Sequence, residues 1–497
     1  MITRRRQAQE LIDIVSGYNL IDGKLVTQPV EGCFDVVDPA TGQIVGRAPE
    51  SSSDLVNDAV QSASEAYPKW AATPPLERSR VLLEAAAALE AQAEDIAAVI
   101  SLETGRPYLT ETKPEVLNAV KIFRYFAGLP LEAKGESFLY GPDVWAVTVR
   151  EPLGVVGAIV PWNVPAMLLC LKVAPALATG NTVVAKPAEQ SPLCSTLIGK
   201  ILSSVLPPGV LNIVNGLGET TGDALVRHPA VRKVAFTGSV AVGESIYKVA
   251  ASKLIPVTLE LGGKSPIIIF DDVEIAQAAQ QTITGMRFSR QGQSCTSTTR
   301  ILVHASVCDR FLAALADAVA ALKVGDPLSD STDVGSLVSR EQADRVRNYI
   351  QAAVREGLDV REIGSSNLPP ELQAESYVPA TLILNPPMTS PVVQEEIFGP
   401  VATLHTWETF EEVIDLANAT EFGLSACILT NSMSHGLTLA RRLQSGFVQI
   451  NSGLVIQPGL SFGGYRNSGI GREASLDSML ESYTQVKTII IDHTTAR

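Results

Sequence analysis

Cysteine and histidine are scarce in this sequence of 497 residues, and those present do not cluster. The 6 cysteines include no Cys-x-x-Cys pair, and none of the 5 histidines has the spacing of a zinc ligand. So few cysteines in so long a chain do not form a disulfide framework, and such usage is typical of a reducing compartment. We therefore expect a cytoplasmic protein without a metal site.

The sequence also has few basic residues relative to acidic ones, and it has no long uninterrupted apolar run. The chain has 39 lysines and arginines against 53 aspartates and glutamates, so its formal net charge is −14 and it repels phosphate backbones. The most apolar stretch, residues 152–180, contains Pro161, Lys172 and Pro175, and it cannot cross a bilayer as one helix. No apolar segment follows the arginines at positions 4–6, so no export signal is predicted. These absences exclude nucleic acid and membrane from the expected partners.

What the chain does contain is the composition of a large globular protein. Hydrophobic residues make up 46% and charged residues 19%, which excludes wholesale disorder. At roughly 100–200 residues per domain, the length corresponds to two or three folding units. Residues 34–48 have the pattern of a hairpin. Helices are predicted from Asp54, as the cap, to about Trp70, and then over 77–102 and 113–127.

The middle of the chain alternates between strands and helices. Strands rich in valine and isoleucine are predicted at 155–160, 181–185, 210–214, 232–237 and 266–270, with helices at 166–178, 191–205, 219–227 and 240–252. This alternation indicates a parallel α/β sheet. A second α/β region has predicted strands at 300–304 and 401–405 and helices at 306–322, 340–355, 409–418 and 434–443. Two more predicted strands, at 143–150 after a Gly-Pro turn and at 484–492, carry apolar residues that need a neighbour.

A nicotinamide cofactor requires helix N-termini that face its phosphates at the edge of a parallel sheet. Gly238 and Ser239 follow a predicted strand and begin a helix, but their spacing to the next glycine differs from the usual G-x-G-x-x-G. This segment therefore does not identify a cofactor site by itself. Lys186 and Glu189, after another predicted strand, are candidates for binding the adenosine ribose, and a solvated ion pair in a loop is the alternative interpretation.

Two further residues have the character of catalytic groups. Cys295 has small polar neighbours, which keep a thiol accessible and can lower its pKa. The alternative for any cysteine is a buried small hydrophobe, and the other five suit that interpretation. Glu260 follows an apolar run, where partial desolvation raises the pKa of a carboxylate towards that of a useful base. The alternative for Glu260 is an ion pair with Lys264 at the end of a strand.

Seven motifs, taken in order along the chain, resemble those of the aldehyde dehydrogenase superfamily. They are Pro161-Trp162-Asn163-Val164-Pro165, Lys186-Pro187-Ala188-Glu189, Phe236-Thr237-Gly238-Ser239, Glu260-Leu261-Gly262-Gly263-Lys264, Gly292-Gln293-Ser294-Cys295, Glu395-Glu396-Ile397-Phe398-Gly399-Pro400 and Ser461-Phe462-Gly463-Gly464. The resemblance extends from the hairpin near residue 34 to the terminal strand. Seven motifs in this order and spacing make chance agreement negligible.

The resemblance implies an α/β fold in three parts. These are a Rossmann-like NAD-binding domain over 1–129 and 153–261, an α/β catalytic domain over 262–470, and a small β oligomerisation arm over 130–152 and 471–497. The active site of such proteins lies at the junction of the cofactor and catalytic domains. The resemblance also implies a homodimer or homotetramer.

The same resemblance assigns roles to individual residues. Cys295 is the expected nucleophile, Asn163 the oxyanion-hole donor, and Glu260 the base that activates the hydrolytic water. The expected cofactor-binding residues are Trp162, Lys186, Glu189, Gly238, Ser239, Glu396 and Phe398. The expected substrate-pocket residues are Val164, Leu168, Leu171, Ser289, Ser294, Thr296, Ile456 and Phe462. This set is aliphatic rather than aromatic. Three positions depart from the family's common pattern: Arg290 replaces a residue that is often neutral, Ser461 replaces the usual proline, and Arg466 replaces a common lysine. These departures leave the substrate open.

The implied reaction is the oxidation of an aldehyde to a carboxylic acid with reduction of NAD, through a thiohemiacetal and a thioester on Cys295. Glu189 is expected to accept hydrogen bonds from the adenosine 2′-hydroxyl and to repel a 2′-phosphate, so NAD is expected in preference to NADP. A CoA-acylating semialdehyde dehydrogenase is the nearest alternative, but such relatives typically lack a base at the position of Glu260. A catalytically silent structural relative is the other alternative, which the intact set of Cys295, Asn163 and Glu260 disfavours.

Overall fold

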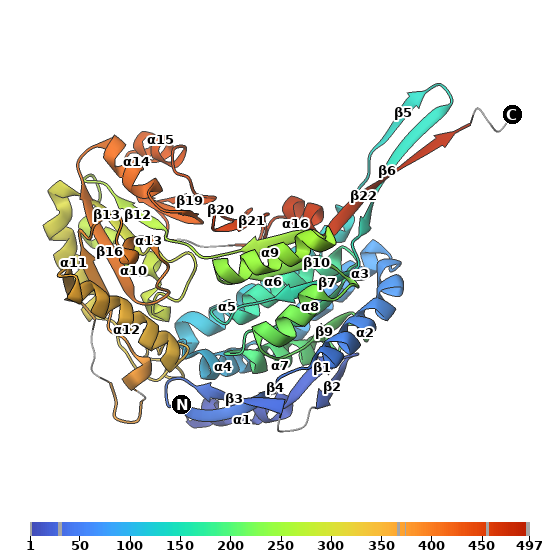
Figure 1. The fold of residues 1–497 in the computed structure, drawn as a ribbon, viewed down its shortest axis with the longest axis horizontal. Coiled ribbons are helices and arrows are strands. Elements are labelled where there is room, and N and C mark those ends of the chain that lie inside the picture. Colours follow the sequence, from blue (N-terminus) through green and yellow to red (C-terminus); the bar gives the residue numbers. More distant parts are fainter. Residues whose placement is uncertain (1, 28–31, 365–367, 373, 454–456, 494–497) are drawn as a thin grey trace.

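Two sheets covered by helices, and an arm that projects from one of them, organise the chain in this computed structural model (Figure 1). The structure describes residues 2–27, 32–364, 368–372, 374–453 and 457–493. Among the helices in these ranges, none combines the length and the apolar character needed to span a bilayer.

The first sheet has eight strands in the order β2-β1-β9-β8-β7-β10-β11-β21. They are β1 (Tyr18–Ile21), β2 (Lys24–Thr27), β7 (Val155–Ile159), β8 (Thr182–Lys186), β9 (Leu211–Ile213), β10 (Val231–Thr237), β11 (Val257–Glu260) and β21 (Gly469–Ile470). The central strands from β9 to β11 are parallel. Neighbouring residues such as Val183 and Val184 are both fully buried, in separate cores on the two faces. Burial on both faces explains why these strands are continuous runs of valine, isoleucine and alanine.

Helices pack on both faces of this sheet. One face is covered by α1 (Ile2–Val15), α3 (Pro75–Ala91), α4 (Ala93–Thr104), α5 (Lys113–Phe126), α6 (Pro165–Ala178), α7 (Pro192–Leu202) and α16 (Leu476–Tyr483). The other face is covered by α2 (Ser53–Ala71), α8 (Asp223–Arg227) and α9 (Val240–Lys253). The predicted hairpin is present as β3 (Cys33–Asp38) and β4 (Gln43–Pro49), which pair antiparallel.

The second sheet has seven strands in the order β14-β15-β16-β13-β12-β18-β19. They are β12 (Pro266–Ile269), β13 (Arg300–His304), β14 (Asp359–Glu362), β15 (Thr381–Leu384), β16 (Val401–Trp407), β18 (Ser425–Leu429) and β19 (Phe447–Ile450). Its helices are α10 (Ile275–Met286), α11 (Cys308–Ala320), α12 (Arg340–Arg355), α13 (Pro391–Gln394), α14 (Phe410–Asn418) and α15 (Met433–Ala440). A separate pair, β17 (Phe422–Gly423) and β20 (Tyr465–Arg466), lies outside both sheets. The strand predicted at 266–270 is β12, and it belongs to this second sheet rather than extending the first.

The arm consists of three antiparallel strands that reach away from the rest of the molecule (Figure 1). They are β5 (Ser137–Gly141), β6 (Val144–Pro152) and β22 (Thr484–Asp492). β22 pairs with β6 along its whole length, from Thr484 opposite Pro152 to Asp492 opposite Val144. The neighbour of the terminal strand is thus the strand predicted at 143–150 of the same chain, and residues 137–141 before it form the other strand of a hairpin.

Several expected elements differ from those observed, each for a local reason. The helix predicted over 77–102 is two helices, because Gln92 has non-helical backbone angles and separates α3 from α4. Ser52, rather than Asp54, caps α2, since its side chain accepts a hydrogen bond from the backbone of Leu55. The helix predicted over 219–227 begins with a π-helical turn, Gly218–Gly222, before α8.

The structure also contains a helix that was not predicted at the N-terminus. In α1, Ala8, Ile12 and Val15 are fully buried and lie on one face, at the spacing of an amphipathic helix. Two arginines before them pair with acids outside the helix, Arg4 with Asp330 at 2.9 Å and Arg5 with Asp38 at 2.5 Å. These arginines therefore attach the helix to the body of the protein.

Candidate active site

A cavity of about 380 Å³ lies between the two sheets, lined by residues from both. The first sheet and its helices contribute residues of α5 and α6 and the ends of β10 and β11. The second part of the chain contributes the segment before β13 and the segment that follows β19. Asn163, Glu260 and Cys295, which are far apart in sequence, all line this one cavity.

Cys295 lies in the loop between α10 and β13, which turns sharply. Gln291 and Gly292 both have positive φ, of 52° and 68°, and a side chain on Gly292 would collide with the backbone oxygen of Gly399. Gly263 allows a second close approach, because a Cβ there would lie 2.5 Å from the carbonyl oxygen of Cys295. These contacts leave the Cys295 side chain partly exposed to the cavity.

The electrostatic surroundings of Cys295 favour the neutral thiol. Burial raises the pKa of this thiol to about 12, and the nearby carboxylates of Glu396 and Glu260 add to the effect, while Arg290 opposes it. The expectation that small polar neighbours lower this pKa is therefore wrong. The reason is that desolvation and two acidic side chains, distant in sequence, outweigh the local polarity.

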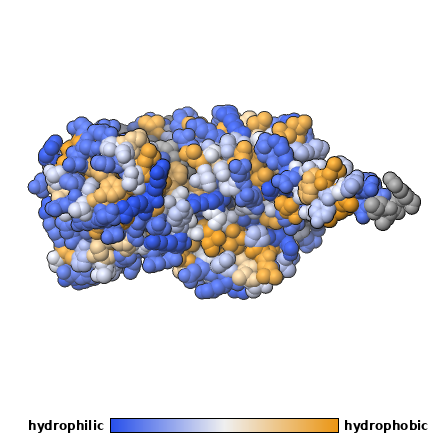
Figure 2. Space-filling view, turned by 90° about the horizontal axis from the view of Figure 1, so that it is seen from above, coloured by the Kyte–Doolittle hydropathy of each residue, from blue (hydrophilic) through white to orange (hydrophobic). Residues whose placement is uncertain are grey.

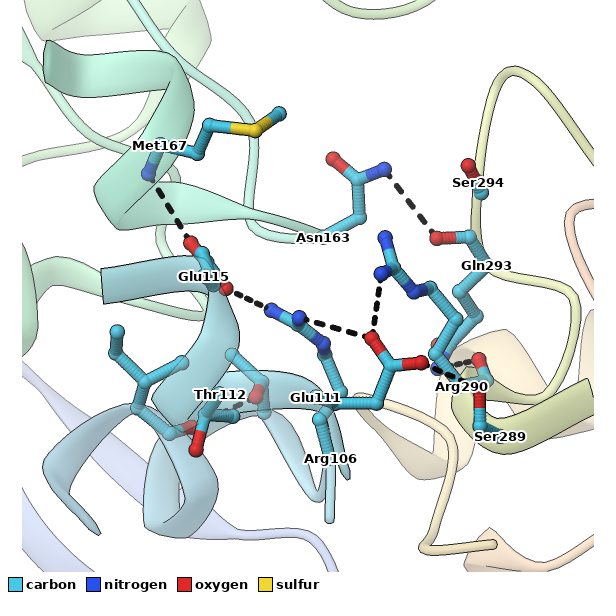
Figure 3. Close-up of polar contacts among 12 residues, drawn as sticks. Arg106, Glu111, Thr112, Glu115, Asn163, Met167, Ser289, Arg290, Gln293 and Ser294 are labelled. Atoms are coloured by element: carbon cyan, nitrogen blue, oxygen red, sulfur yellow. Dashed lines mark hydrogen bonds and ion pairs between the residues drawn. The ribbon is translucent and has the colours of Figure 1, made fainter. Parts of the chain in front are cut away.

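Asn163 is positioned by the turn that precedes α6. Its side chain is 4% exposed, and its Nδ2 donates a hydrogen bond of 3.2 Å to the backbone oxygen of Gln293, next to Ser294 (Figure 3). This bond ties the first sheet to the loop that carries Cys295. A side-chain amide has two N–H donors, of which the contact with Gln293 uses one.

Glu260 is the last residue of β11, and it is 4% exposed. Neither of its carboxylate oxygens has a hydrogen-bond partner among the described residues. Burial raises the pKa of Glu260 well above its usual value, Glu473 raises it further, and Lys172 and Arg472 oppose this. The alternative interpretation as an ion pair with Lys264 is wrong, since the Nζ of Lys264 has no hydrogen-bond partner in the described ranges.

Glu473 and Lys172 were not identified from the sequence. They form an ion pair of 3.0 Å in which the two side chains are 1% and 0% exposed, and Glu473 lines the cavity. Lys172 is the one charged residue of α6, whose other residues are apolar. A lone lysine in an apolar helix signals a buried acidic partner, but not where that partner lies in the sequence.

The edge of the first sheet has the features of a dinucleotide site. Lys186 ends β8, and Ser239 follows β10 and caps α9 by accepting a hydrogen bond of 3.4 Å from Val242. The N-terminus of α9 thus lies at the carboxyl edge of the parallel strands. Lys186 and Glu189 form an ion pair of 2.6 Å. The ion pair of the alternative interpretation is thus present, but only its Glu189 end reaches solvent: the Glu189 side chain is 28% exposed, whereas the Lys186 side chain is 3% exposed and burial lowers its pKa.

Glu396, Phe398 and Trp162 lie where the two sheets meet. Glu396 accepts a hydrogen bond of 2.9 Å from the backbone of Gly263, and a side chain on Gly262 would collide with the same carboxylate. Burial raises the pKa of Glu396 to about 7, although the Gly263 N–H and Lys264 oppose this. The rings of Trp162 and Phe398 meet edge to face, with centroids 5.3 Å apart.

Most of the predicted substrate-pocket residues line the same cavity as Cys295. These are Val164, Leu168, Leu171, Ser294, Thr296 and Phe462. Ser289 does not line it, and instead donates its hydroxyl to the carboxylate of Glu111. Ile456 lies outside the described residues. Arg287 and Glu111 line the cavity and were not identified from the sequence.

Comparisons with known proteins agree with this geometry. The family model described as "Aldehyde dehydrogenase family" matches residues 26–489. The chain is 38% identical over 480 residues to 2-aminomuconic semialdehyde dehydrogenase of Homo sapiens, covering 96% of this chain and 98% of the relative. The structure is similar to betaine aldehyde dehydrogenase of Staphylococcus aureus in complex with NAD+, with a TM-score of 0.94, 32% identity and coverage of 98% and 96%. It is also similar to an NAD-dependent aldehyde dehydrogenase of Sinorhizobium meliloti, with a TM-score of 0.92, 34% identity and coverage of 97% and 96%. The chain belongs to the aldehyde dehydrogenase family.

Proposed function

We propose that the chain oxidises an aldehyde to a carboxylic acid at the cavity that Cys295, Asn163 and Glu260 share. The observation that carries this proposal is the convergence of a thiol, an amide donor and a desolvated carboxylate on one cavity beside a dinucleotide-type sheet edge. These are the groups that nucleophilic attack, oxyanion stabilisation and water activation require. The cysteine usage favours a cytoplasmic location.

The same geometry supports NAD as the oxidant. Gly238 and Ser239 present the N-terminus of α9 to a pyrophosphate, and the Lys186–Glu189 pair lies where the adenosine ribose would bind. Glu396 would bind the nicotinamide ribose, with Phe398 and Trp162 beside the ring. Solved relatives are NAD complexes or NAD-dependent by name. When bound, NAD supplies the acceptor for the hydride that leaves the substrate carbon.

The protein's own residues carry the remaining steps. Cys295 adds to the aldehyde carbon and gives up its thiol proton to solvent, while the Asn163 amide and the backbone N–H of Cys295 stabilise the oxyanion of the thiohemiacetal. Loss of hydride leaves a thioester on Cys295. Glu260 then accepts a proton from the water that attacks the thioester, which releases the carboxylic acid and restores the thiol. The net reaction consumes aldehyde, NAD+ and water and yields acid, NADH and a proton.

Water rather than CoA is the acyl acceptor in this proposal. Glu260 lies in the cavity with no hydrogen-bond partner in the described part of the chain, so its carboxylate is available to a water molecule. An enzyme that transfers the acyl group to CoA has no need of a base in this position. The two acceptors give different products, a carboxylic acid and an acyl-CoA.

The substrate's charge is left open by the relatives. One acts by name on betaine aldehyde, a cation, and another on 2-aminomuconic semialdehyde, whose carboxylate is an anion. The overall fold accommodates both, since both relatives match nearly the whole chain. The residues that line the cavity must therefore determine whether a cationic or an anionic aldehyde is preferred.

The arm supports assembly into a homodimer or homotetramer. Leu139, Tyr140 and Ile490 are 78%, 79% and 67% exposed, and hydrophobic residues gather on the arm in Figure 2. A projecting three-stranded sheet with exposed apolar side chains is stabilised when a second subunit covers it.

Replacing Glu260 with glutamine tests the hydrolytic step. The amide keeps the size of the side chain and removes its basicity, so steady-state turnover should fall about 10²- to 10⁴-fold. Stopped-flow absorbance should still show a burst of NADH near one equivalent per active site, and mass spectrometry should find the acyl group on Cys295. Cys295→Ala is the matched control and should give no burst while retaining NAD binding. Unchanged turnover of Glu260→Gln would contradict the assignment, and loss of the burst would show that Glu260 acts before the thioester forms.

Cofactor preference is expected to depend on Glu189. Its carboxylate favours two ribose hydroxyls and repels a 2′-phosphate, so the kcat/KM of the wild-type protein should be larger with NAD than with NADP. Glu189→Gln removes the repulsion and should reduce this ratio at least about tenfold, the effect of roughly 1.4 kcal/mol. Glu244→Gln, which changes an exposed carboxylate of α9, is the control and should leave the ratio unchanged. A wild-type preference for NADP would refute the assignment.

Assembly through the arm is testable by light scattering. The wild-type protein at micromolar concentration should have the mass of a dimer or a tetramer of the 52.8 kDa chain. Leu139→Glu combined with Ile490→Glu should shift the mass towards one subunit, because charges on the arm oppose burial. Val354→Glu is the control, because it introduces a charge at a residue of α12 that is 58% exposed and lies outside the arm. It should leave the mass unchanged. A wild-type mass of a single subunit would exclude the proposed assembly.

A further inference from the structure

Two arginines lie in the wall of the Cys295 cavity. Arg287 and Arg290 both line the cavity, and both precede Cys295 in the same segment of the chain. Arg290 forms an ion pair with one oxygen of Glu111, whose other oxygen accepts the hydroxyl of Ser289. The guanidinium of Arg290 is therefore held by Glu111, a residue of the π-helical turn Tyr108–Thr112.

Arg106 holds the same carboxylate from the interior. Its side chain is 1% exposed, lies 3.3 Å from Glu111 and forms an ion pair with Glu115. The second oxygen of Glu115 accepts the backbone N–H groups of Ala166 and Met167, at 2.8 and 3.2 Å, at the start of α6. Glu115 is thus engaged by Arg106 and by α6, on the side of Arg106 away from Arg290 (Figure 3).

The cluster contains one more positive charge than negative charge. Its three cations are Arg106, Arg287 and Arg290, and its two anions are Glu111 and Glu115. Burial alone would raise the pKa of Glu111, but Arg290 and Arg106 outweigh it and hold this pKa at about 2, so the carboxylate is charged. Burial, reinforced by Arg290, lowers the pKa of Arg287 to about 10, which still leaves its guanidinium charged near neutral pH.

The other ionisable groups around the cavity do not cancel this excess. Glu473 is already paired with Lys172. Burial raises the pKa of Glu260, which favours its neutral form. Lys121 also lines the cavity and adds positive charge. Phe462 is the one aromatic side chain among the described lining residues, so the cavity lacks the aromatic cage that recognises a quaternary ammonium group.

We propose that Arg287 and Arg290 bind the carboxylate of a semialdehyde, an aldehyde that also carries a carboxylate, while its aldehyde group lies at Cys295. This inference rests on the proposed oxidation at Cys295 and adds the charge class of the substrate. An anion between the two guanidiniums relieves their mutual repulsion and accepts charge-assisted hydrogen bonds in a desolvated site. Glu111 and Arg106 act as positioning residues: Glu111 holds the guanidinium of Arg290, and Arg106 holds the carboxylate of Glu111.

Matched substrates test the charge preference in the wild-type protein. Succinic, glutaric and adipic semialdehydes are each compared with the corresponding methyl ester, which has nearly the same shape and no charge. With saturating NAD, the best semialdehyde should exceed its ester in kcat/KM by about 10- to 100-fold, the contribution of a charge-assisted hydrogen bond. Betaine aldehyde should be a poor substrate. Glutarate should compete with the aldehyde and slow alkylation of Cys295.

Variants locate the preference on the two arginines. Arg287→Gln and Arg290→Gln should each reduce the ratio of semialdehyde to ester by about 10-fold or more, mainly through a larger KM for the semialdehyde. Arg287→Lys keeps the charge and should retain part of the ratio. Arg355→Gln, at the exposed end of α12, is the control and should leave it unchanged. If a glutamine variant does not fold, the alkylation of wild-type Cys295 still tests the carboxylate site: glutarate should slow it, and an unchanged rate would contradict the site.

The two levels of the proposal fail in different ways. If the wild-type protein oxidises no aldehyde in the presence of NAD, the proposed function is wrong. If it oxidises esters and semialdehydes equally well, or prefers betaine aldehyde, oxidation at Cys295 stands and the carboxylate site is refuted. A strong preference for semialdehydes that persists in both glutamine variants would place the carboxylate on other residues and would also overturn this inference.

Discussion

Desolvation of ionisable groups between the two sheets controls the chemistry available to this protein. Burial is the first cause of the raised pKa at Cys295, at Glu260 and at Glu396. Each of these groups is therefore biased towards its neutral form, and charge must develop during the reaction rather than exist beforehand. Lys172 and Glu473, which are also buried, form an ion pair. The raised pKa values mean that Glu260 and Glu396 bind protons more tightly than exposed carboxyl groups do, and the thiol of Cys295 beside them is biased towards its uncharged form.

The sheets can enclose such a site because glycine lets their backbones come close together. Gly262 and Gly263 leave room for the Glu396 carboxylate and for the loop that carries Cys295, and Gly292 lets this loop approach Gly399. A side chain at any of these positions would separate the two parts of the chain and admit water. Water would screen the carboxylates and remove the pKa shifts described above. The fold and the chemistry therefore depend on the same close contacts.

Sequence patterns predicted the parts of the fold that depend on local burial. The parallel strands of the first sheet were predicted because burial on both faces produces runs of valine and isoleucine, as in β8. The break at Gln92 was missed because nothing in the sequence marks it, and β18 and β19 were missed because their short apolar runs lie among similar ones.

The order of motifs placed Cys295, Asn163 and Glu260 at one site. Contacts such as Lys172 with Glu473 could not be predicted, because 301 residues separate the partners. The raised pKa of Cys295 was missed for the same reason, since it depends on burial and on acids from other elements.

The pH dependence of Cys295 alkylation, measured by peptide mapping after reaction with iodoacetamide, tests this account most directly. Burial and the neighbouring carboxylates raise the thiol pKa to about 12. Below that pH the thiolate fraction grows about tenfold for each pH unit, so the alkylation rate of Cys295 should still be rising through pH 9. A rate that reaches its plateau below pH 8 would show that the thiol is already ionised in the resting protein, and it would contradict the view that desolvation keeps this site neutral.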